Sequence, residues 1–362
     1  MDLNKLRARL SEIDDQIIDL VAERQSVVDQ IGVVKRADGH ATRDFVREKQ
    51  VLDTARDRAA RLGVPITLAE SVMELLIRSS LANQEKARVR AEAQGKGRKA
   101  LVIGGGGEMG RWFVEFLDSQ GFDVVVADPQ SRFDGFEKIE DWRQAPDEFA
   151  VTVIAAPISV TRKILEEIAS VRRSGLIFDI GSLKSPLQDE LRRLAAIGVK
   201  ITSLHPMFGP DTQLLSGRHV LFMDVGAPEA TKEARQLFSS TMAQQIEIKL
   251  EDHDRMIAYV LGLSHALNIS FFTALANSCE ILPQLANLSS TTFDAQLEVA
   301  AKVAKENPRL YFEIQSLNPH GLAPLKDLLK AVQEISDVVE QRDEEAFVEL
   351  MERGRSYLEK RR

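Results

Sequence analysis

The chain has 362 residues, which suits two or three domains, and 44% of them are hydrophobic, enough for real cores. Its net charge of −8 argues against a general nucleic-acid or anionic-membrane binder, so an anionic substrate must be met by local clusters of arginine and lysine. The single Cys279 excludes an intramolecular disulfide and a cysteine metal cluster. The first residues lack a signal-peptide apolar region and no run approaches membrane-spanning length, so we expect a cytoplasmic protein without a membrane or metal site.

The predicted fold is multidomain, and residues 1–92 are expected to be all-helical. Apolar residues recur at spacings of three and four over residues 3–34, which predicts one long helix with a narrow apolar seam. A second helix is expected over about 43–62, and a Thr-x-x-Glu capping box at 67–70 predicts the start of a third. Residues 93–99 are polar and glycine-rich, as a linker would be.

Over residues 100–250, strand-like and helix-like segments alternate, as a parallel α/β sheet of the Rossmann type requires. The candidate strands are Ala100–Ile103, Asp123–Ala127, Ala150–Ala155, Leu176–Ile180, Lys200–Leu204 and His219–Met223. Residues 251–362 are predicted to form an all-α domain. Its stretch 257–275 is apolar almost all round, which indicates a buried helix or a helix between subunits.

The first candidate strand runs into a Gly-x-Gly-x-x-Gly pattern at residues 105–110, which opens a helix. These glycines allow a tight turn and close approach of the backbone to a pyrophosphate, which the helix N-terminus attracts. Asp128 ends the next strand. A carboxylate at this place accepts hydrogen bonds from the ribose hydroxyls and repels a 2′-phosphate, so we predict NAD over NADP despite the nearby Arg132. The expected cofactor-binding residues are Gly105, Gly107, Glu108, Met109, Gly110, Asp128, Ala156 and Pro157.

The N-terminal helices place polar side chains on faces that should be apolar. Arg24 lies in the seam of the first helix, Glu48 in that of the second, and Ser80 and Gln84 on the third. Buried charges are costly unless they are paired or bound to a ligand. Either these groups line a site, or Arg24 and Glu48 pair with each other inside a bundle.

The spacing of polar residues across all three helices resembles the all-helical chorismate mutase family. The matching residues are Arg7, Arg24, Lys35, Asp44, Arg47, Glu48, Ser80 and Gln84. Two chains intertwine in that family, and the resemblance implies that Arg7 reaches into the partner's site. It also implies that Arg7, Arg24 and Arg47 hold the two carboxylates of the substrate. Planar guanidinium groups suit carboxylates because two N–H bonds can form at once.

The same resemblance implies roles for the remaining residues of the mutase set. Lys35 and Gln84 would hydrogen-bond the ether oxygen, and Glu48 would take the ring C4 substituent, with Asp44 and Ser80 supporting. The pericyclic rearrangement of chorismate to prephenate needs no general acid or base. It is accelerated by holding a compact conformer and by stabilising the charge that develops on the breaking ether bond.

Further polar motifs fall at the carboxyl ends of predicted parallel strands, where open α/β sheets bind ligands. They are Ala-Ala-Pro at 155–157, Asp-x-x-Ser-x-Lys at 179–184 and His-Pro-Met-Phe-Gly-Pro at 205–210. A neutral imidazole can accept a hydrogen bond from a hydroxyl that is being oxidised, and it titrates near working pH. We favour His205 over the other histidines, of which His253 stands at the start of a predicted helix.

The last two motifs are similar to those of prephenate dehydrogenase, and the whole chain resembles the bifunctional chorismate mutase/prephenate dehydrogenase family. This resemblance implies hydride transfer from ring C4 to NAD⁺, coupled to loss of the ring carboxylate as CO₂, which gives an arylpyruvate on the route to tyrosine. His205 would polarise the C4 substituent, with Ser182 and Ser264 in support. The helical C-terminal part would form a homodimer.

Asp294 departs from the family pattern, which carries at this position an arginine that binds a substrate carboxylate. An aspartate replaces that bidentate pair with repulsion. Three explanations are open: Lys302 or Arg309 supplies the charge, the activity has decayed, or the substrate is different. The 4-amino-4-deoxy analogue of prephenate carries an ammonium that tolerates an acidic site better, and it would give 4-aminophenylpyruvate instead of 4-hydroxyphenylpyruvate.

Two other classes of function make different predictions. A nucleotide-sensing regulator that dimerises through its helices would have incomplete site residues, whereas the mutase set is complete. A generic NAD-dependent 2-hydroxyacid dehydrogenase would lack both the mutase pattern and the decarboxylating-site motif. The sequence therefore favours the two-enzyme interpretation.

Overall fold

The computed structural model describes residues 2–130, 134–146, 148–170, 174–278, 280 and 282–360. Arg132 and Cys279 lie outside these residues. The chain divides into two compact units, of which the first comprises Met1–Ala156, Ile164–Ile180 and Leu191–Glu247. The second comprises Pro157–Lys163, Gly181–Glu190 and Ile248–Arg362.

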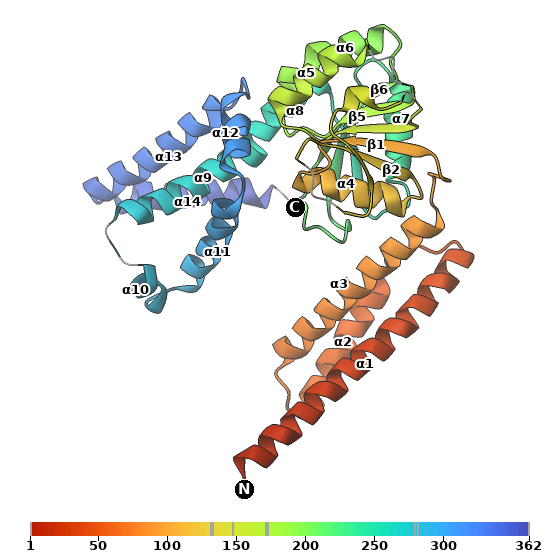
Figure 1. The fold of residues 1–362 in the computed structure, drawn as a ribbon. Helices are drawn as coiled ribbons and strands as arrows, with labels where there is room; N and C mark the ends of the chain where they lie inside the picture. The colour runs from red at the N-terminus through yellow and green to blue at the C-terminus, as the bar shows by residue number, and fades with distance from the viewer. Residues whose placement is uncertain are drawn as a thin grey trace. The chain divides into compact units, whose positions relative to one another are not determined.

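Three long helices open the first unit (Figure 1): α1 (Leu3–Ala37), α2 (Phe45–Leu62) and α3 (Ile66–Ala91). The expected single first helix is confirmed. The capping box predicted for the third helix is wrong, because α3 begins one residue after Pro65 and no side chain caps it. Pro65 is the N-cap residue, with φ −55° and ψ 126°, and its carbonyl accepts the N–H of Leu68 at 3.1 Å.

The apolar seam of α1 is exposed over most of its length. Its exposed members are Leu3, Leu6, Leu10, Ile13, Ile17, Leu20, Val27, Ile31 and Val34. A contiguous apolar stripe of this length marks an interaction surface. Within one chain, α1 packs against α3, and this contact buries Val28.

An eight-stranded sheet forms the rest of the first unit, in the order β3-β2-β1-β4-β5-β6-β7-β8. The six strands that correspond to predictions are β1 (Lys99–Ile103), β2 (Asp123–Ala127), β4 (Val151–Ile154), β5 (Leu176–Asp179), β6 (Ile201–Pro206) and β7 (His219–Met223). The two further strands are β3 (Glu137–Ile139) and β8 (Gln244–Glu247). All neighbouring pairs are parallel except β6 and β7, which are antiparallel.

Helices cover the sheet and complete its core. They are α4 (Glu108–Ser119), α5 (Ile158–Ile168), α6 (Gln188–Ala196) and α7 (Pro228–Leu237). On α4, Phe113 is fully buried and meets Phe178 of β5 edge-on, with ring centroids 5.9 Å apart. Each such buried aromatic ring contributes about 1.5–3 kcal/mol by leaving water. The packing fixes α4, and with it the glycine-rich loop that precedes it.

The second unit is mainly helical beyond residue 248. Its helices are α8 (Leu250–Ile257), the π-helical turn η3 (Ala258–Leu263), α9 (Ser264–Asn277), α10 (Leu282–Asn287), α11 (Thr291–Lys305), α12 (Pro308–Ser316), α13 (Leu322–Gln341) and α14 (Glu344–Glu359). The expected all-α C-terminal domain is confirmed.

The elements α8, η3 and α9 follow one another without a break. In the part of the chain that the structure describes, the combined stretch Leu250–Asn277 is the one helix that is long and apolar enough to cross a membrane by length and composition, with a mean hydropathy of 1.4. The expectation that no run approaches membrane-spanning length is therefore wrong. A single such helix is weak evidence for a span, since core helices of other proteins have the same length and composition.

Candidate active sites

Arg24 links the first and third helices. Its guanidinium donates hydrogen bonds to the hydroxyl of Ser80, at 2.6 Å, and to the carbonyl of Leu76, at 3.2 Å. Ser80 and the neighbouring Gln84 are buried on α3, and the Gln84 amide reaches the carbonyl of Val28 at 3.5 Å. A polar cluster thus occupies the face between α1 and α3 that the apolar periodicity assigns to core.

Arg24 and Glu48 do not pair with each other, as the alternative interpretation required. Both carboxylate oxygens of Glu48 instead accept hydrogen bonds from Arg43, at 2.9 Å each. Lys35 is half-buried near the end of α1 and donates to the carbonyl of Thr42 at 3.0 Å. Arg24 and Glu48 therefore lie on separate helices, and each has its own hydrogen-bond partner, Ser80 for Arg24 and Arg43 for Glu48.

Three predicted substrate-binding residues lie toward solvent. Arg7 is exposed on α1, beside the apolar seam. Asp44 caps α2 by accepting the backbone N–H of Arg47 at 2.9 Å, and the exposed guanidinium of Arg47 contacts Gln50 at 3.3 Å. Within one chain, the structure brings together Arg24, Ser80 and Gln84, but it leaves Arg7 apart from them.

The glycine-rich loop leaves no room for a side chain at Gly105 or Gly110. A Cβ at Gly110 would lie 2.1 Å from the carbonyl oxygen of Gly104, and a Cβ at Gly105 would lie 2.8 Å from Val126. Gly104 itself has φ +82°, in the left-handed region that favours glycine. Helix α4 begins after Gly107 without a side-chain cap. The N–H groups of its first turn therefore have no side-chain acceptor, as at a phosphate site on a helix N-terminus.

Asp128 follows β2 and faces this loop. Its carboxylate accepts the N–H of Gly106 at 3.0 Å and that of Gln130 at 2.8 Å, so the acid also shapes the loop. A cavity of about 450 Å³ lies beside the glycine-rich loop and is lined by Gly106, Glu108, Arg111, Trp112, Glu115, Pro210 and Asp211. The absent Cβ atoms, the uncapped helix end and the carboxylate fit the pyrophosphate and ribose of a dinucleotide.

His205 lies on β6 with only 4% of its surface exposed. Two residues earlier on the same strand, Ser203 donates to the buried carboxylate of Asp179 at 2.6 Å. After β6 the chain forms a loop over residues 207–218, which returns as the antiparallel strand β7. The histidine is therefore held on a central strand, near its carboxyl end, where sequence reasoning expects it.

The second unit holds the Asp-x-x-Ser-x-Lys segment through an acid that sequence reasoning missed. Asp254, only 1% exposed, accepts the N–H of Lys184 at 2.9 Å and that of Ser185 at 2.7 Å. It also pairs with the fully buried ring of His253 at 2.7 Å. Burial alone would raise the pKa of Asp254, but these hydrogen bonds lower it to about 2. Ser182 is half-buried two residues before Lys184.

The histidine next to Ser264 was also missed. His265 stacks on Tyr311, with ring centroids 4.1 Å apart, and burial lowers its pKa to about 4. Its Nδ1 is buried without a hydrogen-bond partner among the described residues. Ser264 is exposed, and its hydroxyl donates to the carbonyl of Val260 at 2.9 Å. Neither the stacking of His265 on Tyr311 nor its lowered pKa has a local sequence signal, because both depend on the packing of α9 against α12.

Asp294 lies exposed in the first turn of α11 and accepts a hydrogen bond from the hydroxyl of Ser289. An acid suits this place, since the N-terminal end of a helix carries partial positive charge. Lys302 lies eight residues on, about 12 Å along the helix axis, and pairs with Glu298 at 2.8 Å. That spacing argues against Lys302 as the substitute cation. Arg309 is exposed at the start of α12.

Three family models match the chain. They describe chorismate mutase type II over residues 6–85, the nucleotide-binding domain of prephenate dehydrogenase over 130–246, and the dimerization domain of prephenate dehydrogenase over 249–353. The T-protein of Enterobacter agglomerans is 28% identical over 351 residues, which cover 96% of this chain and 90% of that protein. The matches therefore extend across the mutase helices, the sheet and the C-terminal helices.

Two further similarities concern the dehydrogenase part. The 4-amino-4-deoxyprephenate dehydrogenase of Streptomyces pristinaespiralis is 29% identical over 271 residues, covering 72% of this chain and 91% of that protein. The crystal structure of prephenate dehydrogenase from A. aeolicus, with hydroxyphenyl propionate and NAD⁺, has a TM-score of 0.57 at 18% identity. It covers 73% of this chain and 98% of that one, and it shows a shared fold.

Proposed function

Because the chain belongs to the bifunctional chorismate mutase/prephenate dehydrogenase family, we propose that the residues described above carry its two reactions in turn. The protein rearranges chorismate to prephenate, and it oxidises and decarboxylates prephenate with NAD to 4-hydroxyphenylpyruvate. The observation that carries the residue assignments is the half-buried Arg24, which meets Ser80 on a face that should be apolar.

In the mutase reaction, Arg24 and Arg47 bind the substrate carboxylates together with Arg7 of a second copy. Lys35 and Gln84 donate to the ether oxygen, where negative charge grows as the C–O bond breaks. Donors that are already held in place lose little freedom at the transition state. The hydrogen bonds of Lys35 Nζ to the carbonyl of Thr42 and of Gln84 Nε2 to the carbonyl of Val28 support this role. They hold in place the nitrogen atoms that would donate to the ether oxygen.

Glu48 accepts the hydrogen bond of the ring C4 hydroxyl, Ser80 supports Arg24, and Asp44 holds the start of α2. The support for Glu48 is its half-buried carboxylate, which Arg43 keeps in one orientation. The support for Asp44 is its capping bond to Arg47, which ties the position of one carboxylate-binding arginine to the helix start. A mutase side chain that is displaced lowers the rate of the rearrangement even when it still binds the substrate.

In the dehydrogenase reaction, the glycine loop and Asp128 hold NAD, with Glu108, Met109, Ala156 and Pro157 around it. A bound NAD⁺ would supply the acceptor for the hydride that leaves ring C4. His205 accepts the hydrogen bond, and then the proton, of the C4 hydroxyl as it becomes a carbonyl. Ser182 and Ser264 support the same end of the substrate, and aromatisation of the ring drives loss of the carboxylate. The burial of His205 supports this role, because water is kept from the proton transfer.

The protein acts as a homodimer in the cytoplasm under this proposal. The exposed seam of α1 and the exposed apolar face of α13, with Leu329, Val332, Ile335 and Val339, are surfaces that a second copy would cover. The apolar stretch α8–α9 has only 28% of its most apolar window buried within one chain. The single cysteine suits a compartment in which thiols stay reduced.

A second substrate is favoured by one observation. Asp294 is an exposed carboxylate at a place where prephenate would need a cation, and one relative is a 4-amino-4-deoxyprephenate dehydrogenase. The amino analogue, which carries a positive charge, is the weaker candidate. Its ammonium lies at ring C4, whereas the family arginine binds a carboxylate.

An assay that starts from chorismate tests both halves of the proposal. Chorismate absorbance is followed first without NAD⁺, and NADH formation is followed after NAD⁺ is added. We expect chorismate to disappear in the first stage and NADH to form in the second. Absence of chorismate turnover would contradict the mutase assignment. If no NADH forms from prephenate or from its amino analogue, the dehydrogenase assignment is contradicted.

A further inference from the structure

Arg43 stands just before α2 and contacts both a mutase residue and the sheet domain. Its Nε and Nη2 donate to the two oxygens of Glu48, at 2.9 Å each. Its Nη1 donates to the hydroxyl of Ser216, at 2.8 Å, and its guanidinium lies 4.3 Å from the centre of the Phe45 ring. A planar guanidinium with three directed bonds and a stacking partner has little rotational freedom.

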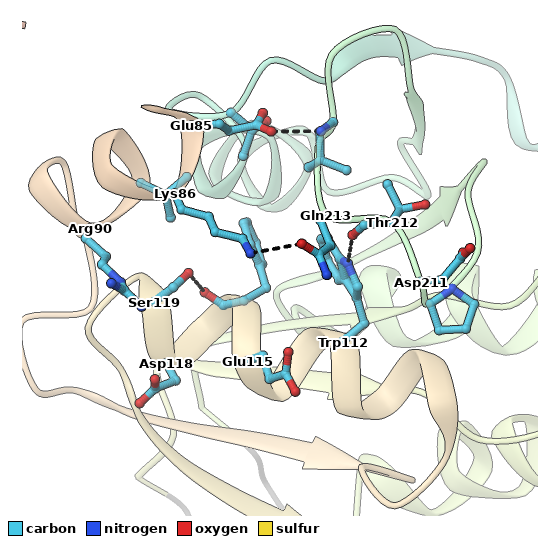
Figure 2. A pocket seen from close by; sticks show the side chains of 15 residues that line it. Glu85, Lys86, Arg90, Trp112, Glu115, Asp118, Ser119, Asp211, Thr212 and Gln213 are labelled. Atoms are coloured by element: carbon cyan, nitrogen blue, oxygen red, sulfur yellow. Dashed lines mark hydrogen bonds between the residues drawn. The ribbon is translucent and has the colours of Figure 1, made fainter. Parts of the chain in front are cut away.

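Ser216 belongs to the loop over residues 207–218. Figure 2 shows Thr212 and Gln213 of this loop beside Trp112 and Lys86. The N–H of Leu215, one residue before Ser216, donates at 2.7 Å to the carboxylate of Glu85 on α3, and Glu85 is only 4% exposed. The indole N–H of Trp112 donates to the carbonyl of Thr212 at 3.0 Å. Ser216 therefore offers Arg43 an anchor with a well-defined position.

Glu48 has space to move if Arg43 releases it. The pair borders a cavity of about 970 Å³ whose lining includes Arg43, Glu48 and Ser216. The side chain of Glu48 is 19% exposed, so its carboxylate retains access to water in other rotamers. Hydrogen bonds between charged groups are stronger than neutral ones and select one orientation. Arg43 thus distinguishes one rotamer of Glu48 from the others.

We propose that Arg43 is a positioning residue of the mutase site and that Ser216, from the dehydrogenase domain, completes it by fixing Arg43. The inference rests on the proposed role of Glu48 as acceptor of the ring C4 hydroxyl. Arg43 acts through Glu48 and needs no contact with the substrate. The mutase site then extends into the domain of the second enzyme, and a hydroxyl on a dehydrogenase loop contributes to the rate of the rearrangement.

The test compares mutase and dehydrogenase turnover in the full chain. We expect Arg43→Ala to lower mutase kcat/KM by about 10–100-fold and Arg43→Lys to restore part of the loss, because lysine can hold Glu48 or Ser216 but not both in one plane. Ser216→Ala should lower it by about 3–10-fold. NADH formation from the dehydrogenase substrate should stay unchanged in all three variants, which reports that the sheet and C-terminal helices fold, while partial rescue by Arg43→Lys reports on the N-terminal helices. Ser170→Ala is the matched control, since this exposed serine of the same unit bonds only locally, to the carbonyl of Glu167.

A double variant separates positioning from a general effect on the fold. Because Ser216 acts through Arg43, Ser216→Ala should have no further effect on mutase kcat/KM in the Arg43→Ala background. An equal loss in both backgrounds would overturn the inference, as would full mutase activity in the two single variants while Glu48→Gln is impaired. Full mutase activity of Glu48→Gln would instead contradict the role of Glu48 in the proposed function. The two failures are therefore distinguishable.

Discussion

The guanidinium of Arg24 and the hydroxyl of Ser80 lie 2.6 Å apart, so a charged side chain from the apolar seam of α1 contacts α3. A second bond joins the same Nη1 to the carbonyl of Leu76 at 3.2 Å. A guanidinium has five N–H bonds, and those on Nε and Nη2 remain for a bidentate carboxylate. These donors are the ones that the carboxylate binding proposed for Arg24 would use.

Arg24→Ala should therefore abolish the mutase reaction and spare the dehydrogenase. We expect mutase kcat/KM to fall by about 100-fold or more, as when a transition-state donor is removed, and NADH formation from prephenate to remain. Loss of chorismate absorbance measures the first, and NADH absorbance the second. Arg9→Ala is the control on the same helix, because Arg9 is 61% exposed and pairs only with Glu12. Equal activity of both variants would refute the assignment of Arg24.

Gly110→Ala should abolish NAD binding. The added Cβ would lie 2.1 Å from the carbonyl oxygen of Gly104, so α4 or the loop must move. The matched change Gly354→Ala adds the same atom to the interior of α14 and meets nothing within 4 Å. Titration calorimetry with NAD⁺ measures binding, and retained mutase turnover shows that the N-terminal helices are intact. Wild-type affinity in Gly110→Ala would contradict the phosphate-loop assignment.

Substitutions at Asp294 test which of the two substrates the protein uses. If the carboxylate repels prephenate, Asp294→Arg should lower KM for prephenate by about tenfold and raise KM for the 4-amino analogue. Asp294→Asn removes the charge without adding a cation and should lie between the two. Steady-state NADH formation with each substrate is the measurement. Fast turnover of prephenate by the unaltered protein, unchanged in Asp294→Arg, would show that this position does not contact the substrate.

Asp254 should stabilise the second unit above pH 4. Its pKa is about 2 in the folded protein against 3.8 for the free side chain, so its contribution of about 2 kcal/mol is fully present above pH 4 and is lost as the pH falls toward 2. Asp254→Asn should lower the thermal midpoint of unfolding at pH 7 and approach the wild type near pH 2–3. Calorimetry over that range tests this. A pH-independent difference would mean that lost acceptor geometry, not charge, is responsible.

The strands and the glycine loop could be predicted because their signals are local. Six apolar runs and three close-packed glycines need no information about the remainder of the chain. The edge strands β3 and β8 were missed, since Glu137–Ile139 and Gln244–Glu247 are short, polar and ordered mainly by pairing with β2 and β7. Contacts such as Asp254 with Lys184 depend on segments that only the fold brings together.

The mutase set shows the same limit. The spacing of Arg24, Ser80 and Gln84 on amphipathic helices was readable, because each interrupts an apolar face. Arg43 belongs to the residue pattern that resembles chorismate mutase, but it was given no role, since an arginine next to a helix cap is ordinary in sequence. Only the bond to Ser216 distinguishes it. Positioning residues act through a neighbour, so their role is visible after folding and not before.

The exposed apolar seam of α1, with Arg7 beside it, has a consequence for mixtures of two inactive variants. If each site takes Arg24 from one chain and Arg7 from the other, a protein with Arg7→Ala and a protein with Arg24→Ala are both inactive as mutases alone. When the two variants are refolded together, half of the dimers contain one chain of each kind. In such a dimer one site carries both substitutions and the other site carries neither. Such a mixture should recover about a quarter of wild-type mutase activity, although neither polypeptide encodes a working site.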